Sequence, residues 1–200
     1  MRTEFEATFI NVDKDQIREK LLYAGAVLVY PERLQRRSNF YLPDKNEFSW
    51  VRVRDEGGGL ITLSYKNVPD KANNINEQKE LCLKVDDFEL AKEFLLAAGC
   101  FEKSFQETRR EAWQLGGADI TIDEWPFLNP FVEIEAESEE IVKAVSELIG
   151  FDYNQALFCN VFYVYSQQYG ISVEELKRRV ENDLNQLTFD PSIKNPFIIQ

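Results

Sequence analysis

The chain has 200 residues, of which 44% are hydrophobic, and a formal net charge of -12. This length suits one domain, or one domain with an appendage. The negative balance argues against a protein that binds nucleic acid through nonspecific phosphate contacts, because such proteins are normally basic. Histidine is absent, which excludes histidine metal sites and catalytic systems built on a histidine base.

The first residues and the cysteines indicate a cytoplasmic protein. Charged residues appear from Arg2 onward, unlike a secretory signal, and no apolar run is long enough to span a membrane. Cys82, Cys100 and Cys159 lie far apart and form no CxxC pair. We therefore expect buried free thiols in a reducing compartment.

The hydrophobic pattern predicts many strands and a few amphipathic helices. Residues 3–10 alternate between polar and apolar side chains, which is the period of a strand. N-cap residues predict four helices, which begin after Asp13, Asp86, Ser138 and Ser172 and end near Gly25, Ala98, Gly150 and Leu187. Further strands are predicted at 27–33, 36–42, 48–54, 60–66, 77–85, 102–114, 118–124 and 130–137, with a Gly57–Gly59 hairpin loop and a polar loop at 67–76. The stretch 156–168 is apolar and ambiguous.

Charged and polar residues occupy one face of most of these strands. For a single strand, the ordinary interpretation is a solvated face. If helices cover the apolar face and the sheet curls into a barrel, the polar face becomes the lumen instead. The residues concerned are Glu4, Glu6, Arg52, Arg54, Thr62, Ser64, Lys66, Gln78, Glu80, Lys84, Asp119, Thr121, Asp123, Glu133 and Glu135.

Such a lumen needs a ligand that balances its charges. Pairs such as Glu4 and Glu6 require a cation between them, while Arg52 and Arg54 require an anion, since uncompensated buried ions cost several kcal/mol each. Carboxylates suit Mg²⁺, which proteins often bind together with substrate phosphates, and arginine holds phosphate oxygens. The pattern therefore predicts a metal-bound polyphosphate.

The ordered set of charged motifs resembles the CYTH family, which comprises class IV adenylyl cyclases, thiamine triphosphatases and related triphosphate tunnel metalloenzymes. The resemblance covers roughly residues 2–165 and implies an α+β fold, an eight-stranded antiparallel β-barrel with helices packed outside. It is carried by Glu4-x-Glu6, Arg52-x-Arg54, Lys66, Arg109-Arg110-Glu-Ala-Trp113 and Asp123 followed by Glu133-x-Glu135. The domain boundaries that we predict are 1–168 for this barrel and 169–200 for a C-terminal helical extension and tail.

The resemblance also implies a role for each matching residue. The implied ligands of Mg²⁺ or Mn²⁺ are Glu4, Glu6, Glu80, Asp123, Glu133 and Glu135. The implied triphosphate-binding residues are Arg37, Arg52, Arg54, Lys66, Arg109 and Arg110, and among them Arg54, Lys66 and Arg110 are the predicted catalytic residues.

Two departures from the family pattern leave the activity open. Thr8 stands where the family signature has lysine, and residues 156–165 offer Asn160 instead of a basic residue. Hydrolysis of a nucleoside, thiamine or inorganic triphosphate is slightly preferred. The alternatives are cyclase activity that makes cyclic AMP and pyrophosphate, a noncatalytic triphosphate- or polyphosphate-binding module, and a structural barrel with surface charges. The expected partner is a small-molecule triphosphate, with no nucleic acid or membrane, and a homodimer is left open.

Overall fold

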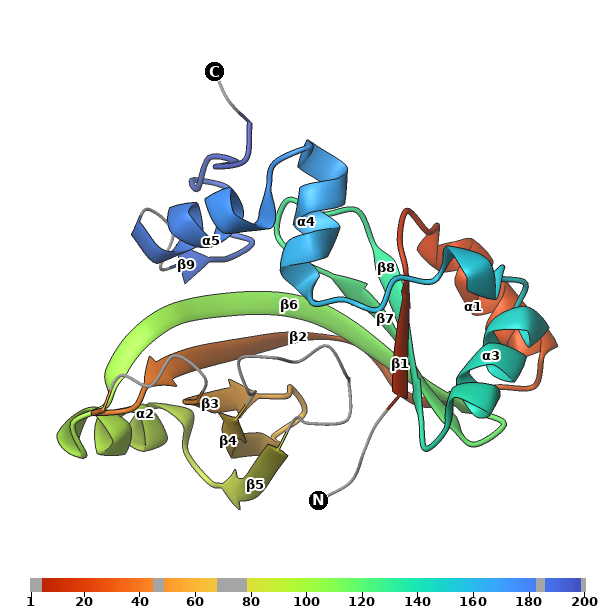
Figure 1. Cartoon of the computed structure of the whole chain (residues 1–200). Helices are drawn as coiled ribbons and strands as arrows, with labels where there is room; N and C mark the ends of the chain where they lie inside the picture. The colour runs from red at the N-terminus through yellow and green to blue at the C-terminus, as the bar shows by residue number, and fades with distance from the viewer. Residues whose placement is uncertain (1–4, 45–48, 68–78, 183–185, 199–200) are drawn as a thin grey trace. The chain divides into compact units, whose positions relative to one another are not determined.

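The structure is a computed structural model that describes residues 5–44, 49–67, 79–182 and 186–198 (Figure 1). The strands are β1 Phe5–Phe9, β2 Val27–Tyr41, β3 Ser49–Asp55, β4 Ile61–Asn67, β5 Lys79–Val85, β6 Phe101–Leu115, β7 Ala118–Glu124, β8 Phe131–Ala136 and β9 Gln186–Leu187. The helices are α1 Lys14–Tyr23, α2 Phe88–Ala97, α3 Glu139–Leu148, the 3₁₀ turn η2 Tyr153–Gln155, α4 Val161–Tyr169 and α5 Val173–Asn182.

Eight strands form one hydrogen-bonded path in the order β1-β8-β7-β6-β2-β3-β4-β5, and the short β9 pairs with β6. The β1–β8, β8–β7, β7–β6, β2–β3, β3–β4 and β4–β5 pairs are antiparallel, whereas β9 runs parallel to β6. An α+β fold with eight antiparallel strands and helices packed outside is therefore confirmed. The described residues contain no pairing that joins the terminal strands β1 and β5 to each other.

The chain divides into two compact units. Among the described residues, unit 1 comprises 34–108 and 178–196, apart from the gaps given above. Unit 2 comprises 5–33, 109–177 and 197–198. The predicted boundary at residue 168 stays a prediction. No helix in the described part of the chain is long and apolar enough to cross a membrane.

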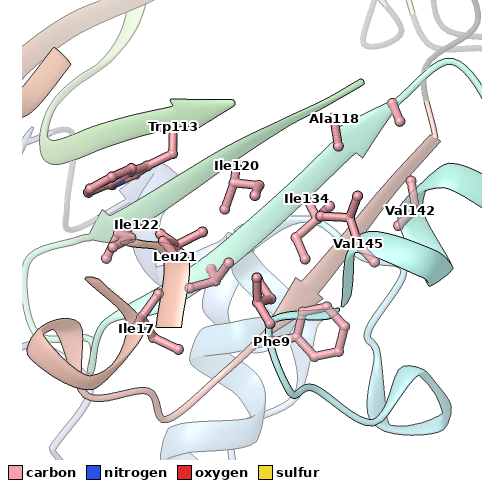
Figure 2. Packing of buried hydrophobic residues seen from close by; sticks show 14 residues of the cluster. Phe9, Ile17, Leu21, Trp113, Ala118, Ile120, Ile122, Ile134, Val142 and Val145 are labelled. Atoms are coloured by element: carbon pink, nitrogen blue, oxygen red, sulfur yellow. The ribbon is translucent and has the colours of Figure 1, made fainter. Parts of the chain in front are cut away.

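Unit 2 buries one face of its sheet against two amphipathic helices. Ile17 and Leu21 of α1, together with Val142 and Val145 of α3, pack against strand residues (Figure 2). The strand residues of this core are Ala7, Phe9, Trp113, Ala118, Ile120, Ile122, Val132, Ile134 and Ala136. Because side chains alternate along a strand, every strand that contributes to this core presents its other face away from α1 and α3.

Unit 1 follows the same rule with a smaller core. Val51 and Val53 of β3 and Phe40 of β2 pack with Phe88 and Leu95 of α2. The intervening residues of β2 and β3 lie on the opposite face of the sheet. Both units thus use the apolar half of an alternating pattern for folding and leave the polar half available.

The helix starts agree with the sequence pattern at three of four positions. The side chains of Asp13, Ser138 and Ser172 accept hydrogen bonds from the backbone N–H three residues later. The second helix is capped by Asp87, whose carboxylate accepts from the N–H of Leu90 at 2.9 Å. The prediction of Asp86 as this cap was wrong by one residue, because either aspartate could satisfy the pattern.

Other boundaries also differ from the prediction. The two strands expected at 27–33 and 36–42 are one strand, β2, because Leu34 and Gln35 have no turn-forming character. The last helix ends at Asn182 rather than near Leu187, and Gln186–Leu187 forms β9. The ambiguous 156–168 segment contains α4. The predicted 67–76 loop lies almost wholly outside the described residues. The expectation of three buried thiols holds for Cys100 alone, because Cys82 is exposed and Cys159 is half-buried.

Candidate functional site

One face of the unit 2 sheet gathers charged side chains from four strands. Glu6 and Thr8 of β1 pair in register with Glu135 and Glu133 of β8, and Arg110 of β6 pairs with Asp123 of β7. Residues that pair in register project to the same side of a sheet. This acidic face, which lies opposite the core of α1 and α3, comprises Glu6, Thr8, Arg110, Asp119, Thr121, Asp123, Glu133 and Glu135.

Arg110 joins two carboxylates of the acidic face. Its Nε donates to Asp123 Oδ1 at 2.6 Å and its Nη2 donates to Asp123 Oδ2 at 2.9 Å. The same Nη2 donates to Glu133 Oε2 at 2.7 Å. Asp123 is fully buried and also accepts from Thr121 Oγ1 at 2.6 Å. Burial disfavours the charged guanidinium, yet Asp123 and Glu133 outweigh it and raise the pKa of Arg110 above its ordinary value.

Glu6 shows that one arginine does not neutralise this face. Burial, followed by the charges of Glu133 and Glu135, raises the pKa of the Glu6 carboxyl to about 8. Arg110 opposes this rise, and Asp123 adds to it. The acidic face therefore carries more negative charge than its own residues balance, so a positively charged ligand is favoured there.

The thiol of Cys159 lies in the electrostatic field of the same carboxylates. Burial first, and then the carboxylates of Glu6 and Glu133, raise the pKa of its thiol to about 11. Sequence reasoning did not associate this cysteine with the charged residues, because residues 150–160 carry no motif. Its thiol is therefore held in the neutral form beside the acidic face.

The chemistry of the acidic face fits a hard divalent cation, although its described residues do not form a complete set of ligands. Mg²⁺ and Mn²⁺ prefer carboxylate oxygens, and Glu6, Glu133 and Glu135 offer them on a face with unbalanced negative charge. In the described part of the chain, no three His, Cys, Asp or Glu residues converge as a metal-binding group. The residues present therefore fit the ion by donor type and charge.

The polar face of unit 1 has the opposite sign. Arg37 of β2 pairs in register with Arg54 of β3, and Arg52 and Arg54 pair with Ser64 and Thr62 of β4. Lys66 and Lys84 follow on the same side, in register with Trp50 and Thr62. This basic face comprises Arg37, Asn39, Arg52, Arg54, Thr62, Ser64, Lys66 and Lys84, and it lies opposite the core residues Phe40, Val51 and Val53.

Several donors of the basic face have weak or no acceptors. Arg37 Nη2 donates to Thr108 Oγ1 at 3.2 Å, and Arg54 Nη1 donates to Glu56 Oε2 at 3.4 Å. Among the described residues, buried Arg54 Nε and Ser64 Oγ have no hydrogen-bond partner. A buried donor without an acceptor is costly, and an oxyanion beside Arg54 would remove that cost.

The structure separates the predicted residues into distinct groups. Arg109 projects to the side opposite Arg110, where its Nη1 donates to Glu124 Oε1 at 3.1 Å. Of these two arginines, Arg110 is the one on the acidic face. Glu80 belongs to unit 1, where it pairs in register with Lys66. Glu4 lies outside the described residues, so its predicted role as a ligand stays a prediction.

This combination defines a class of protein: an antiparallel sheet with helices on its apolar face and opposite charges on its polar faces. The family model of the CYTH domain matches residues 4–149, so the chain belongs to the CYTH domain family. A search of curated protein sequences finds no match.

Solved structures of the same fold are similar at low sequence identity. A protein from Pyrococcus horikoshii OT3 is 23% identical with a TM-score of 0.63, covering 80% of this chain and 98% of that one. A putative adenylate cyclase from Vibrio parahaemolyticus is 11% identical with a TM-score of 0.69, covering 82% and 98%. A putative adenylyl cyclase from Hippeastrum, described as having a dominant triphosphatase activity, is 14% identical with a TM-score of 0.57, covering 86% and 99%.

Proposed function

We propose that this chain is a metal-dependent enzyme that hydrolyses a triphosphate. The observation that carries the proposal is the unbalanced acidic face, on which Arg110 leaves Glu6 beside Glu133 and Glu135. Membership of the CYTH family supports an enzyme that acts on triphosphates. The triphosphatase activity described for the Hippeastrum protein favours hydrolysis over cyclisation.

The acidic face would hold Mg²⁺ or Mn²⁺ through Glu6, Glu133 and Glu135. Asp123, which is bound twice by Arg110, keeps the guanidinium fixed. Arg110 in turn limits the repulsion between Asp123 and Glu133. The bound ion would supply positive charge that polarises a phosphoryl oxygen.

The basic face would bind the phosphates. Arg54 has a buried Nε without an acceptor among the described residues and can donate to a phosphate oxygen. Arg37, Arg52 and Lys66 share its face and add positive charge. Charge that develops on the leaving phosphate is then stabilised by donors already in place, which is the main contribution of a protein to phosphoryl transfer.

Product analysis tests this function. The chain is incubated with Mn²⁺ or Mg²⁺ and, in turn, ATP, GTP, thiamine triphosphate and inorganic triphosphate. Metal-dependent release of inorganic phosphate is expected, and it should fall strongly in Arg54→Ala. If the products from ATP are cyclic AMP and pyrophosphate, the activity is that of a cyclase and the proposed hydrolysis is wrong. Binding of a triphosphate without any product would reject the enzyme.

Thr8 favours one second candidate, a noncatalytic triphosphate-binding module. Thr8 is buried, and its Oγ1 has no hydrogen-bond partner among the described residues. It pairs in register with Glu133, at the position where the family resemblance implies a lysine. A neutral hydroxyl cannot supply a positive charge to a phosphate, so binding could persist without turnover. Gain of turnover in Thr8→Lys alone would support this candidate.

A further inference from the structure

The loop between β7 and β8 closes the end of the acidic face that contains Asp123. Asp123 pairs with Phe131 in the last register position before the loop, which runs over residues 125–130. Glu133 lies two residues beyond this pair. The β7–β8 ladder fixes the spacing of the two strands as far as the Asp123–Phe131 pair. The loop begins directly beyond this pair, so its conformation acts on the strand ends that carry Asp123 and Glu133.

Three side chains of α4 hold the backbone of this loop. Tyr165 Oη donates to the carbonyl of Pro126 at 2.7 Å. Gln168 Nε2 donates to the carbonyl of Phe127 at 2.9 Å, and its Oε1 accepts from the N–H of Asn129 at 2.9 Å. Tyr169 Oη also donates to the carbonyl of Phe127. The 165, 168 and 169 positions share one helix face, so α4 contacts the loop along its length.

The loop conformation requires such support. Phe127 has a φ of 66°, which is the left-handed region that a bulky residue rarely adopts. Its carbonyl is the acceptor of both Tyr169 and Gln168. Trp125 and Leu128 are buried on either side of it. The hydrogen bonds from α4 therefore stabilise a turn whose backbone is strained at Phe127.

Phe197 packs on the two tyrosines. Its side chain is 3% exposed, and its ring centroid lies 4.6 Å from that of Tyr165 and 5.3 Å from that of Tyr169. It also meets the Phe127 ring edge-on at 6.5 Å. Both α4 and Phe197 lie beyond residues 4–149, the part that the family model matches.

We propose that Phe197, Tyr165 and Tyr169 form a C-terminal latch that positions Asp123 and Glu133 by holding the β7–β8 loop. The three are positioning residues, since none of them belongs to the acidic face. The expected consequence of the latch is tighter cation binding, and this part rests on the proposed function. The latch itself is measured by amide exchange, which needs no turnover. Groups that orient metal-binding carboxylates commonly change metal affinity by about 10-fold or more when removed.

The test compares Phe197→Ala and Tyr169→Phe with the unsubstituted 200-residue chain. The matched control is Ile198→Ala, because the neighbouring Ile198 is 61% exposed. The N–H groups of Leu128 and Asn129 donate to Trp125 O and Gln168 Oε1. The rate of hydrogen exchange at these two amides measures how firmly the latch holds the loop. Titration with Mn²⁺ alone, followed by water-proton relaxation, measures the affinity of the acidic face for the cation. Phe197→Leu tests rescue by a conservative apolar side chain.

Both test variants are expected to speed exchange at these two amides about 10-fold and to weaken Mn²⁺ binding about 10-fold. Ile198→Ala should match the wild type, and Phe197→Leu should recover most of the affinity. Unchanged exchange in both test variants overturns the latch, and faster exchange with unchanged Mn²⁺ affinity overturns its positioning role. If the wild type hydrolyses no triphosphate but the test variants bind Mn²⁺ more weakly than it does, the latch is supported and only the proposed function is rejected. A wild-type chain that binds no Mn²⁺ rejects both.

Discussion

The two units place opposite charges on the polar faces of similarly built sheets. In unit 2, one arginine serves Asp123 and Glu133 while Glu6 keeps a raised pKa. In unit 1, the buried Nε donor of Arg54 has no acceptor among the described residues. Buried or half-buried charges are expensive unless they are paired, so neither face serves folding well. The comparison indicates that the acidic face favours a cation and the basic face favours an anion.

The largest expected effect comes from breaking the Arg110–Asp123 ion pair on the acidic face of unit 2. Asp123→Ala leaves Arg110 without the carboxylate that its Nε and Nη2 contact. Removing one partner of a buried pair typically costs about 3–5 kcal/mol, and we expect the free energy of unfolding to fall by that amount in chemical denaturation. Asp119→Ala, at an exposed position on the same face, should cost less than about 1 kcal/mol. Equal losses would contradict this account.

Removing an unsatisfied donor from unit 1 should affect the ligand rather than the fold. In Arg54→Ala the expected loss is about 100-fold in turnover, as for a charge-stabilising donor in other active sites. The thermal midpoint should change little, because the hydrogen bond from Arg54 Nη1 to Glu56 Oε2 is long, at 3.4 Å. Arg36→Ala is the matched control, since Arg36 pairs with Asp55 and stacks on Phe88. A similar loss of turnover in both variants would show that the basic face has no specific role in the reaction.

The alternation of residues along the strands made much of the two faces predictable. Arg52 and Arg54 alternate with Val51 and Val53, and this two-residue period alone placed both arginines on the face opposite the core. The same reasoning could not choose between Arg109 and Arg110, because consecutive residues of one strand always face opposite ways. Only the pairing with Glu124 and Asp123 decides between them.

Other features of the site depend on contacts between distant segments. Cys159 lies more than a hundred residues from Glu6, and no local pattern announces that the two share a field. The support of the β7–β8 loop by Tyr165, Tyr169 and Phe197 is equally invisible, since aromatic residues in a helix usually indicate a core. The sequence thus predicts which side chains share a strand face, but not what holds the strand ends.

The cysteines allow the fields of the two units to be compared directly. The raised pKa of Cys159, about 11, lowers its thiolate fraction at pH 8, while the higher basicity partly restores nucleophilicity. The net expectation is alkylation on the order of 20-fold slower than for a free thiol. Exposed Cys82 in unit 1 is the internal reference, and peptide mapping after timed iodoacetamide treatment gives both rates. Equal rates would show that Cys159 lies outside the field of Glu6 and Glu133.

The last expected effect is a slope of stability against pH that depends on Glu6, and it is small over any single pH unit. Because the folded pKa is about 8 and the ordinary value is 4.5, the folded chain keeps this proton where the unfolded chain has lost it. The contribution of Glu6 is therefore complete below pH 4.5 and disappears as the pH rises towards 8. Within that window the free energy of unfolding should fall by at most about 1.4 kcal/mol per pH unit.

Glu6→Gln removes the titrating group and should flatten this slope without reversing it. Urea denaturation at several pH values, in the presence of a chelator, measures the slope for both chains. Added Mg²⁺ should also flatten the slope of the wild type, because a bound cation favours the ionised carboxylate, and should change Glu6→Gln less. A wild-type slope that equals that of Glu6→Gln would mean that the acidic face of unit 2 is balanced after all, and the contrast with unit 1 would then rest on the basic face alone.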